Sequence, residues 1–303
     1  MHECRALSLG ACRASKSRIT VVAAVALGPL LVGCPDRDRI DAPVSARQAM
    51  ERIHANYARI PSPLQCDATV SFSFLDDQKV KRRFIAHPAT IIFGPPRCLY
   101  FDVKATLGGS VARLGSSDDR YWLWLDTPDY RKLFWGTWEA LEESRARPLA
   151  IPPDQLLDVL MLRTLPDLVG GGMRPLLRRD AKADDRLLFT EIDDDGWPRL
   201  QREVILNTQS PYLPARIVDR DAAGRVRMDA TIEQYSKIEG GEGYIARRYV
   251  IDWPLDDATL RIDFSRVKLR TSPLLGVCEF PRAWNGEVEL LDEPVLNGAG
   301  ADE

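Results

Sequence analysis

The sequence predicts a mainly β protein of the α+β class, with one large twisted antiparallel sheet of about ten or eleven strands and helices packed on one face. Two observations lead to this prediction. Apolar and polar residues alternate with a period of two in segment after segment, and turn-forming residues separate these segments. Only two stretches have the spacing of an amphipathic helix. A sheet with one apolar face must bury it, and the helices are the elements that can cover it.

The composition is that of an ordinary globular protein. The chain has 303 residues, a formal net charge of −3, 28% charged residues and 45% hydrophobic residues. These values exclude intrinsic disorder and a basic nucleic-acid-binding protein as descriptions of the whole chain. No linker or internal repeat divides residues 45–290, so we expect one domain there, followed by a polar tail at residues 291–303.

The chain begins with a basic segment followed by an apolar one. Arg5, Arg13, Lys16 and Arg18 precede the uncharged run Ile19–Val32. That run is shorter than the roughly 20 apolar residues that a membrane-spanning helix needs. Residues 1–33 are therefore typical of an export signal peptide.

The end of this segment, Leu31, Val32, Gly33 and Cys34, resembles the lipobox of bacterial lipoproteins. The resemblance implies that the Cys34 thiolate takes up a diacylglyceryl group, and that Cys34 becomes an N-acylated first residue after cleavage. Residues 34–44 would then be a lipidated tether. We expect an envelope protein anchored in a membrane by its lipid, at the periplasmic face of the outer membrane in preference to the inner membrane. A signal peptide with an incidental cysteine is the alternative.

Three cysteines follow the tether, namely Cys66, Cys98 and Cys278. At least one of them has no intramolecular partner. A disulfide and buried thiols remain open as alternatives, since export permits a disulfide without requiring one. The chain contains no Cys-x-x-Cys pair, which argues against a structural zinc site.

Two helices are expected. Ser45–Arg59 begins with the Ser-Ala-Arg-Gln sequence of a capping box and has one apolar face; Pro61 and Pro63 end it. The second helix follows Pro152-Pro153, with Asp154 as a candidate cap and an apolar stripe formed by Leu156, Leu157, Leu160 and Met161. The glycines at 170–172 precede no Lys-Ser/Thr pair, so they do not form a phosphate loop.

The remaining elements are strands with turns between them. Asp221–Gly224 and Asp194–Gly196 are typical hairpin turns. The clearest strands are Val70–Phe74, Leu99–Lys104, Tyr121–Leu125, Val226–Ile232 and Leu260–Phe264.

This order of elements, together with three local segments, resembles the LolA/LolB family of lipoprotein carriers and receptors. Lys81–Pro88 with Arg97–Phe101 is similar to the family's strand pair around an Arg-Pro motif. Leu114–Trp124 is similar to its Ser-Asp-Gly hairpin, and Pro214–Asp219 to a later strand. The resemblance implies an incomplete antiparallel β-barrel whose concave face, covered by helices, is an apolar cavity for acyl chains.

The alternating stripes identify candidate residues for such a cavity. A core filled by side chains is the alternative, since inward-facing stripes are also what an ordinary core requires. The candidates are Phe72, Phe74, Phe84, Leu99, Phe101, Val103, Tyr121, Leu123, Leu125, Leu157, Leu160 and Met161.

Two departures from the soluble carrier are visible. The position that holds its lid-latching arginine is His87 here, a residue that is mostly neutral near pH 7, so His87 is a candidate lid contact of a different kind. The predicted anchor at Cys34 is a feature of the membrane-bound receptor. Thr271–Val277 is a candidate loop for contact with the bilayer, and an ordinary packed loop is the alternative.

The sequence offers little for catalysis. After the signal peptide it has only His54 and His87, and it contains none of the common metalloprotease, hydrolase-elbow or dinucleotide motifs. The acidic pairs Asp76-Asp77, Asp184-Asp185 and Asp256-Asp257 lie in turn-like contexts. Asp193–Gly196 lacks the Glu at position twelve of a calcium loop. We expect a non-enzymatic protein without metal or other cofactor, apart from bound lipid and the acyl groups on Cys34.

Three functions are consistent with these features. The first is a membrane-anchored lipoprotein that binds acyl chains, plausibly those of other lipoproteins, during lipid or lipoprotein transport. The second is an envelope sensor on the same fold. The third is a structural or glycan-binding lipoprotein with a filled core, for which Trp122, Trp124, Trp135 and Trp138 could supply aromatic surface. Membrane and acylated lipoproteins or lipids are the expected partners, and nucleic acid is not.

Overall fold

The structure is a computed structural model. It describes residues 42–293 except 77, 106–107, 144, 148, 150, 164–173, 180–183, 194, 275 and 282–283. These residues belong to one compact unit, Arg39–Glu303. The predicted signal peptide, lipobox and Cys34, and the glycines at 170–172, lie outside the described residues.

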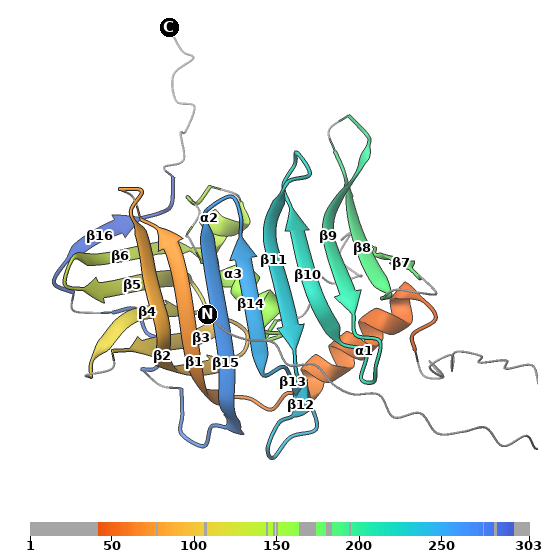
Figure 1. Ribbon diagram of the computed structural model, residues 1–303, viewed down its shortest axis with the longest axis horizontal. Helices are drawn as coiled ribbons and strands as arrows, with labels where there is room; N and C mark the ends of the chain where they lie inside the picture. Colours follow the sequence, from red (N-terminus) through yellow and green to blue (C-terminus); the bar gives the residue numbers. More distant parts are fainter. Residues whose placement is uncertain are drawn as a thin grey trace, which may run out of the picture. The chain divides into compact units, whose positions relative to one another are not determined.

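One 14-stranded sheet dominates the fold, and a two-stranded ribbon accompanies it (Figure 1). The strands are β1 (Leu64–Leu75), β2 (Lys81–Gly94), β3 (Cys98–Lys104), β4 (Ser110–Ser116), β5 (Arg120–Thr127), β6 (Tyr130–Thr137), β7 (Leu176–Arg178), β8 (Arg186–Ile192), β9 (Pro198–Leu206), β10 (Pro214–Arg220), β11 (Val226–Glu233), β12 (Ser236–Lys237), β13 (Tyr244–Ile245), β14 (Arg248–Trp253), β15 (Ala258–Leu269) and β16 (Glu287–Leu290).

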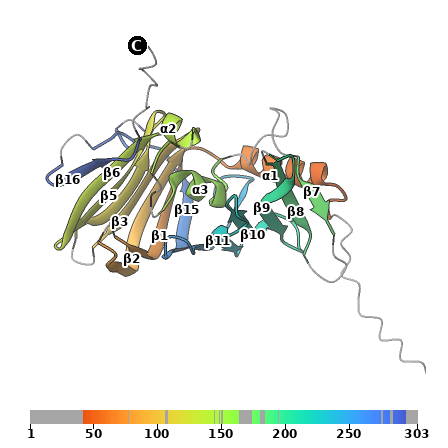
Figure 2. The same ribbon diagram turned by 90° about the horizontal axis from the view of Figure 1, so that it is seen from above.

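The sheet has the order β16-β6-β5-β4-β3-β2-β1-β15-β14-β11-β10-β9-β8-β7, and β12 pairs with β13 in the ribbon. Every neighbouring pair in the sheet is antiparallel except β16 and β6. In one half of the sheet the chain runs from β1 at the centre to β6 near one edge. In the other half it runs from β7 at the opposite edge back to β15, which lies beside β1. Among the described residues β7 and β16 form the two edges, so the sheet is curled but not closed (Figures 1 and 2). The predicted class, a mainly β incomplete barrel, is confirmed.

The strand number exceeds the predicted ten or eleven for a physical reason. Several additional strands are very short, such as β7 and β16, and offer too few residues for a period of two to be recognised. β16 is also parallel to its neighbour, which the antiparallel prediction did not include. Leu291, placed by sequence in the polar tail, is 3% exposed and belongs to the core.

The core lies on the concave side of the sheet. In β1 alternate residues from Leu64 to Phe74 are buried, as its alternating sequence predicts. A bulge between Asp67 and Ala68 shifts the register with β15, so that Val267 and Phe264 both point inward. The three helices lie inside the curl, on one side of the sheet (Figure 2).

The first helix, α1 (Ala46–Arg59), confirms the predicted capping box. The Ser45 hydroxyl accepts a hydrogen bond from the Gln48 N–H, and the Gln48 side chain accepts one from the Val44 N–H at 2.9 Å. Its apolar face buries Met50 and Ile53 against the sheet. Asn56 is buried in the same face, where its amide satisfies both backbone groups of Tyr244 at 2.8 and 2.9 Å.

The other helices are short. α2 (Trp138–Glu142) was not predicted, and Thr137 caps it by accepting from the Ala140 N–H. α3 (Pro153–Val159) is the expected second helix. Its cap residue is Pro152, and Asp154 lies inside the first turn, so the prediction that Asp154 caps the helix is wrong. The proline at the first helical position starts the helix without a side-chain cap.

The segment between β15 and β16 lies against strands of the sheet. A disulfide joins Cys98 to Cys278, which settles the alternative left open by the sequence, and Cys66 is a buried free thiol. Leu274 lies where a side chain on Gly94 would be, so this part of Thr271–Val277 packs on β2. The predicted membrane-contact loop thus has its described apolar residues Leu274 and Val277 half-buried.

The tryptophan cluster packs against the same segment. Trp122 and Trp135 are cross-strand partners, and the ring of Phe280 contacts both edge-on. Trp124 meets Trp284 in the same way. Aromatic packing therefore accounts for these rings, with Trp138 placed on α2 instead of a strand.

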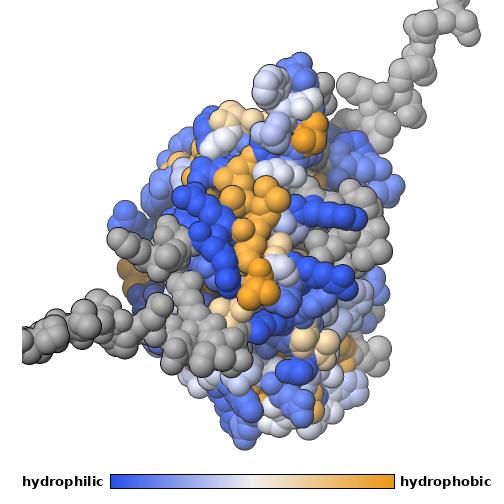
Figure 3. Space-filling view, turned by 90° about the vertical axis from the view of Figure 1, so that its right-hand side faces the viewer, coloured by the Kyte–Doolittle hydropathy of each residue, from blue (hydrophilic) through white to orange (hydrophobic). Residues whose placement is uncertain are grey.

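The edge at β7 carries apolar surface. Figure 3 faces this side and shows a hydrophobic strip between hydrophilic residues. Leu176 of β7 is 62% exposed and lies beside Leu188 of β8, whose neighbours Leu187 and Phe189 point into the core. Leu176 and Leu188 therefore face away from the core. No helix among the described residues is long and apolar enough to span a membrane.

Candidate functional site

The structure brings all twelve predicted cavity residues into one hydrophobic cluster on the concave side. Eleven of them are buried, and Phe84 is half-buried against the cluster. Phe72, Phe74 and Phe84 stack on one another, with ring centroids 4.1 Å apart for Phe72 and Phe84. The period-two stripes therefore identified nine residues that share one face of the sheet, and the helical stripe identified three, Leu157, Leu160 and Met161, that pack against it.

Residues 138–162, which we call the plug segment, cover that surface. The plug segment includes α2, α3 and the chain between them. Among its described residues the buried hydrophobic side chains are Trp138, Ala140, Leu149, Ile151, Leu156, Leu157, Val159, Leu160, Met161 and Leu162. Beneath it a void of about 20 Å³ remains, lined by Phe72, Phe101, Val103, Leu123 and Ile151 among others. A void of this size holds about one water molecule, so side chains of the plug segment fill most of the space over this surface.

A larger apolar pocket opens beside the void. Its volume is about 340 Å³, and its walls come from the ends of β1, β5, β6 and β16 and from the plug segment. Phe74, Tyr130, Phe134 and Leu149 line it. Leu123 lines both this open pocket and the closed void. The volume lies within the range of small-molecule sites.

Charged residues at the rim of the open pocket are paired. Asp76 accepts from Arg82 Nε at 2.8 Å, and Arg147 forms an ion pair with Glu289 at 2.8 Å. Burial acts to raise the pKa of Asp76, but hydrogen bonds from the Val80 N–H, Arg82 and the Gln78 N–H outweigh it and hold the pKa below its usual value. The rim is therefore polar and ordered, whereas the walls are apolar.

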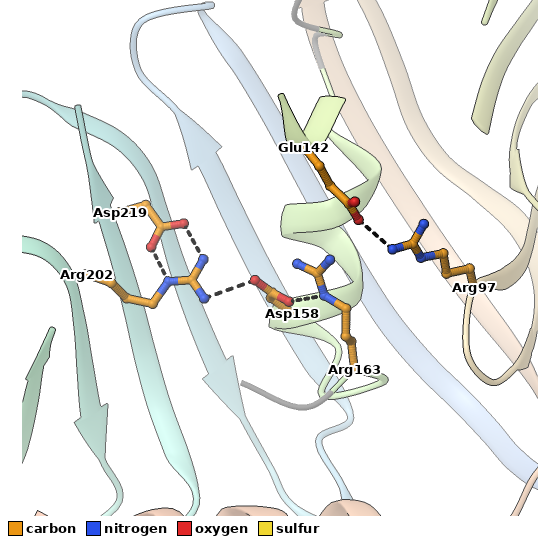
Figure 4. A network of polar contacts seen from close by, with 6 residues as sticks. All are labelled: Arg97, Glu142, Asp158, Arg163, Arg202 and Asp219. Atoms are coloured by element: carbon orange, nitrogen blue, oxygen red, sulfur yellow. Dashed lines mark hydrogen bonds and ion pairs between the residues drawn. The ribbon is translucent and has the colours of Figure 1, made fainter. Parts of the chain in front are cut away.

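Ion pairs fasten the plug segment to the sheet (Figure 4). Arg202 of β9 donates to both carboxylate oxygens of Asp219 on β10, at 2.6 and 2.8 Å, and to Asp158 of α3 at 2.9 Å. Asp158 also accepts from Arg163 at 2.7 Å. At the other end of the plug segment, Arg97 pairs with Glu142.

Further hydrogen bonds hold the plug segment to the rest of the fold. The Trp253 indole donates to Gln155 at 2.6 Å in the core, and the Trp138 indole donates to the Ser117 carbonyl at 2.8 Å. Asp292, from the segment after β16, accepts from the hydroxyl of Thr137 at 2.8 Å and from its N–H. The C-terminal strand therefore helps to position the start of the plug segment.

His87, the candidate lid contact, has neighbours on adjacent strands. It lies on β2 opposite Val70, and its Nδ1 is 2.9 Å from the Lys104 carbonyl. Its ring meets Phe84 edge-on. A lid role for His87 stays a prediction.

The sequence analysis missed the network around Arg202. Arg202 lies two residues before buried Val204, and Asp219 lies two after buried Ile217, so both charges fall in inward-facing stripes. A charged residue in an apolar stripe is the signal that could have identified them, because a buried charge needs a partner. The partner on α3, Asp158, follows Leu157 in the apolar part of that helix.

Two of the acidic residues singled out in the sequence have structural roles. Asp193 accepts from the backbone N–H groups of Asp195 and Trp197 in its hairpin, and Asp257 pairs with Lys81. Among the described residues, no group of three or more His, Cys, Asp or Glu is placed to hold a metal ion. The Cys66 thiol is inert for a physical reason, since burial raises its pKa to about 12.

No protein-family model and no curated protein matches the chain. Solved structures similar to it include a LolA superfamily protein from Nitrosomonas europaea, with 15% identity and a TM-score of 0.47 over 78% of this chain and 99% of that one. A second is a DUF1329 family protein from Desulfovibrio piger, with 12% identity and a TM-score of 0.46 over 75% of this chain and 94% of that one. A third is an outer membrane lipoprotein-sorting protein domain from Vibrio parahaemolyticus, with 13% identity and a TM-score of 0.44 over 75% of this chain and 94% of that one. The first is named for the superfamily that the sequence segments resemble. TM-scores below 0.5 at these identities give no function for this chain.

Proposed function

We propose that this protein is a non-enzymatic envelope lipoprotein that binds acyl chains on the concave face of its sheet. The open apolar pocket is the point of access, and the plug segment is the cover that moves aside. Cys34 supplies the membrane anchor, and the bound chains belong to lipids or to other lipoproteins in transport.

One observation carries this proposal. The open pocket of about 340 Å³ and the void of about 20 Å³ share Leu123 as a wall, so the two spaces are adjacent. A chain that passes the charged rim meets the apolar walls of the pocket, and it reaches the void if the plug segment yields. Phe74 leads from the pocket to the stacked Phe72 and Phe84.

The energies involved limit how far the plug segment can move. A chain of about fifteen methylenes gains roughly 12 kcal/mol on full burial, at about 0.8 kcal/mol for each methylene. The described residues of the plug segment include nine large buried apolar side chains, each worth about 1.5–3 kcal/mol, so exposing all of them would cost more than the chain gains. An acyl chain can therefore displace part of the plug segment but not the whole of it.

The plug segment also supports a second candidate function, a structural lipoprotein with a filled core. Its side chains leave only the small void, as a permanent core would. The two functions differ in one respect: the filled core has no acyl ligand at all.

The test is acyl binding by the Leu123→Trp variant. The indole fills the shared wall, so we expect binding of a fluorescent sixteen-carbon fatty acid and of a palmitoylated peptide to fall by at least about tenfold, the loss of a few buried methylenes. Ile85→Trp is the matched control, because Ile85 is 75% exposed on β2 and adds the same bulk outside the pocket. Circular dichroism verifies that both variants fold.

Native mass spectrometry of protein isolated from a lipid-containing host completes the test. A co-purified lipid or lipopeptide that Leu123→Trp removes supports acyl binding. A protein that carries no ligand, and that binds neither probe, contradicts it and leaves the filled core.

A further inference from the structure

A second pocket, polar in character, lies on the other side of α3. Its volume is about 310 Å³, and it lies between α3 and strands β8–β11. Four arginines line it, Arg163, Arg202, Arg220 and Arg227. Three aspartates, one glutamine from α3 and one from β9, and Phe189 complete the lining. We call it the arginine pocket.

Two of the aspartates are already used. Asp219 gives both oxygens to Arg202, and Asp158 gives one oxygen to Arg202 and the other to Arg163 (Figure 4). These two carboxylates and two guanidinium groups form a closed network of four charges. Their charges balance within the network.

The other two arginines are not balanced in this way. Arg220 donates one hydrogen bond to the Gly224 carbonyl at 3.1 Å, and neither Arg220 nor Arg227 has a carboxylate within 4.0 Å among the described residues. Asp256 lies within electrostatic range of Arg227 without forming an ion pair. Most of the N–H donors of these two guanidinium groups therefore remain available to a ligand.

The third aspartate, Asp154, is part of the same lining. Its Oδ1 is buried and accepts no hydrogen bond from the described residues. Burial, and next the charge of Asp158, raise the pKa of Asp154, while Arg163 acts in the opposite direction. Asp154 thus presents a buried polar atom without a partner to this pocket.

We propose that the arginine pocket binds a phosphate group, with Arg220 and Arg227 as its charged ligands. Guanidinium groups match phosphate oxygens because they donate pairs of N–H bonds in a fixed plane.

The position of α3 connects this site to the concave face. Asp154 and Asp158 of α3 face the arginine pocket, while Leu156 and Leu157 belong to the hydrophobic core. The phosphate is therefore placed as the headgroup of a phospholipid whose chains lie on the core side of the helix. This assignment of the phosphate to a lipid rests on the proposed function, whereas the phosphate site itself does not.

The experiment uses the full chain in dodecyl maltoside micelles and the variant Arg220→Gln/Arg227→Gln. Binding of glycerol 3-phosphate is measured by calorimetry, and binding of dioctanoyl phosphatidylglycerol and of dioctanoylglycerol, which lacks phosphate, by native mass spectrometry. We expect the variant to bind glycerol 3-phosphate at least about tenfold more weakly, since hydrogen bonds to charged groups are worth about 1.5–3 kcal/mol each. Arg83→Gln, which removes an exposed arginine of β2, should bind as the unmodified chain does.

The arms distinguish the sources of the phosphate. Loss of both glycerol 3-phosphate and phosphatidylglycerol binding in the double variant, with dioctanoylglycerol unaffected, supports a lipid headgroup site. Loss of glycerol 3-phosphate alone supports a site for a free phosphate compound. No binding of glycerol 3-phosphate to the unmodified chain, or equal binding to the double variant, overturns the phosphate site. Acyl binding that persists in that case leaves the proposed function intact.

Discussion

Arg202 of β9 and Asp158 of α3 form an ion pair of 2.9 Å that joins the sheet to the plug segment covering its concave face. Both side chains are largely buried, with 13% and 4% of their surface exposed. Arg202 also binds Asp219 through two hydrogen bonds, so its charge remains compensated on the sheet side. The bond to Asp158 is thus the part of the network that depends on the position of α3.

Asp158→Asn should loosen the plug segment. The variant keeps the shape of the side chain but removes the charge that faces Arg163 and Arg202. We expect the free energy of unfolding to fall by about 2–3 kcal/mol. This is less than the roughly 3–5 kcal/mol typical of a broken buried ion pair, because Arg202 still has Asp219 as a partner. Urea denaturation measures this change, and hydrogen exchange should show α3 opening more often.

The control for this variant is Asp229→Asn. Asp229 pairs with Arg216 between neighbouring strands, and these side chains are 27% and 48% exposed. A pair this exposed should contribute less than about 1 kcal/mol. Equal losses of stability in the two variants would contradict a special role for Asp158.

The disulfide should stabilise the C-terminal edge of the sheet. Cys98 and Cys278 are 180 residues apart in sequence, and the bond holds the segment that leads to β16 and to Asp292. We expect reduction, or Cys98→Ala/Cys278→Ala, to cost about 2–5 kcal/mol. Thermal unfolding with and without reductant measures the loss. Cys66→Ala is the control: it leaves the disulfide intact, so reductant should lower its unfolding temperature as it does for the unmodified protein. Unfolding that is indifferent to reductant would refute this role.

The sequence was sufficient to predict the fold class because alternation is a local property. The stripe through Phe72 and Phe74, the capping box at Ser45 and the hairpin at Asp221 each depend on residues close together in the chain. The short edge strands and the parallel pairing of β16 with β6 depend on distant segments. No local pattern in four residues such as Glu287–Leu290 specifies that partner.

The candidate site divides in the same way. The inward-facing residues were predictable because strand positions follow the period of two, and Leu157, Leu160 and Met161 follow the spacing of a helix. Whether they enclose a cavity depends on the conformation of residues 138–162, and their packing is set by tertiary contacts such as Gln155 with Trp253 and Thr137 with Asp292. Arg202 could have been recognised as a charge in an apolar stripe, but its partner Asp158 is 44 residues away.

Cys34→Ala should release the protein from membranes. Each buried acyl methylene adds about 0.8 kcal/mol of membrane affinity, and several chains hold a protein firmly. Fractionation of cells that express the full chain should move the protein from the membrane pellet to the soluble fraction, or leave it as an uncleaved precursor of higher mass. Cys66→Ala should stay in the pellet with the mature mass, since Cys66 is a buried residue of β1. A Cys34→Ala protein of mature mass in the pellet would exclude the lipid anchor.

Asp154→Asn should change how stability depends on pH. Burial, followed by the charge of Asp158, raises the pKa of Asp154 in the folded state, and Arg163 acts in the opposite direction. The Tyr121 hydroxyl also lies within electrostatic range of this carboxyl group. The folded protein therefore retains the Asp154 proton at a pH where the unfolded chain has lost it. Between the two pKa values, stability falls as the pH rises.

The amide that Asp154→Asn introduces cannot ionise, so the variant lacks this loss. We expect the two proteins to differ little below about pH 4, the pKa of an unfolded aspartate. Above this pH the variant should become more stable than the unmodified protein. The difference in free energy of unfolding should reach about 1 kcal/mol, the lower end of the cost of an unsatisfied buried acceptor. Urea denaturation from pH 4 to pH 8 measures the difference. Asp129→Asn, at an exposed turn position, is the control for the substitution itself. A difference for Asp154→Asn that does not change with pH would mean that Asp154 ionises in the folded protein as it does in the unfolded chain.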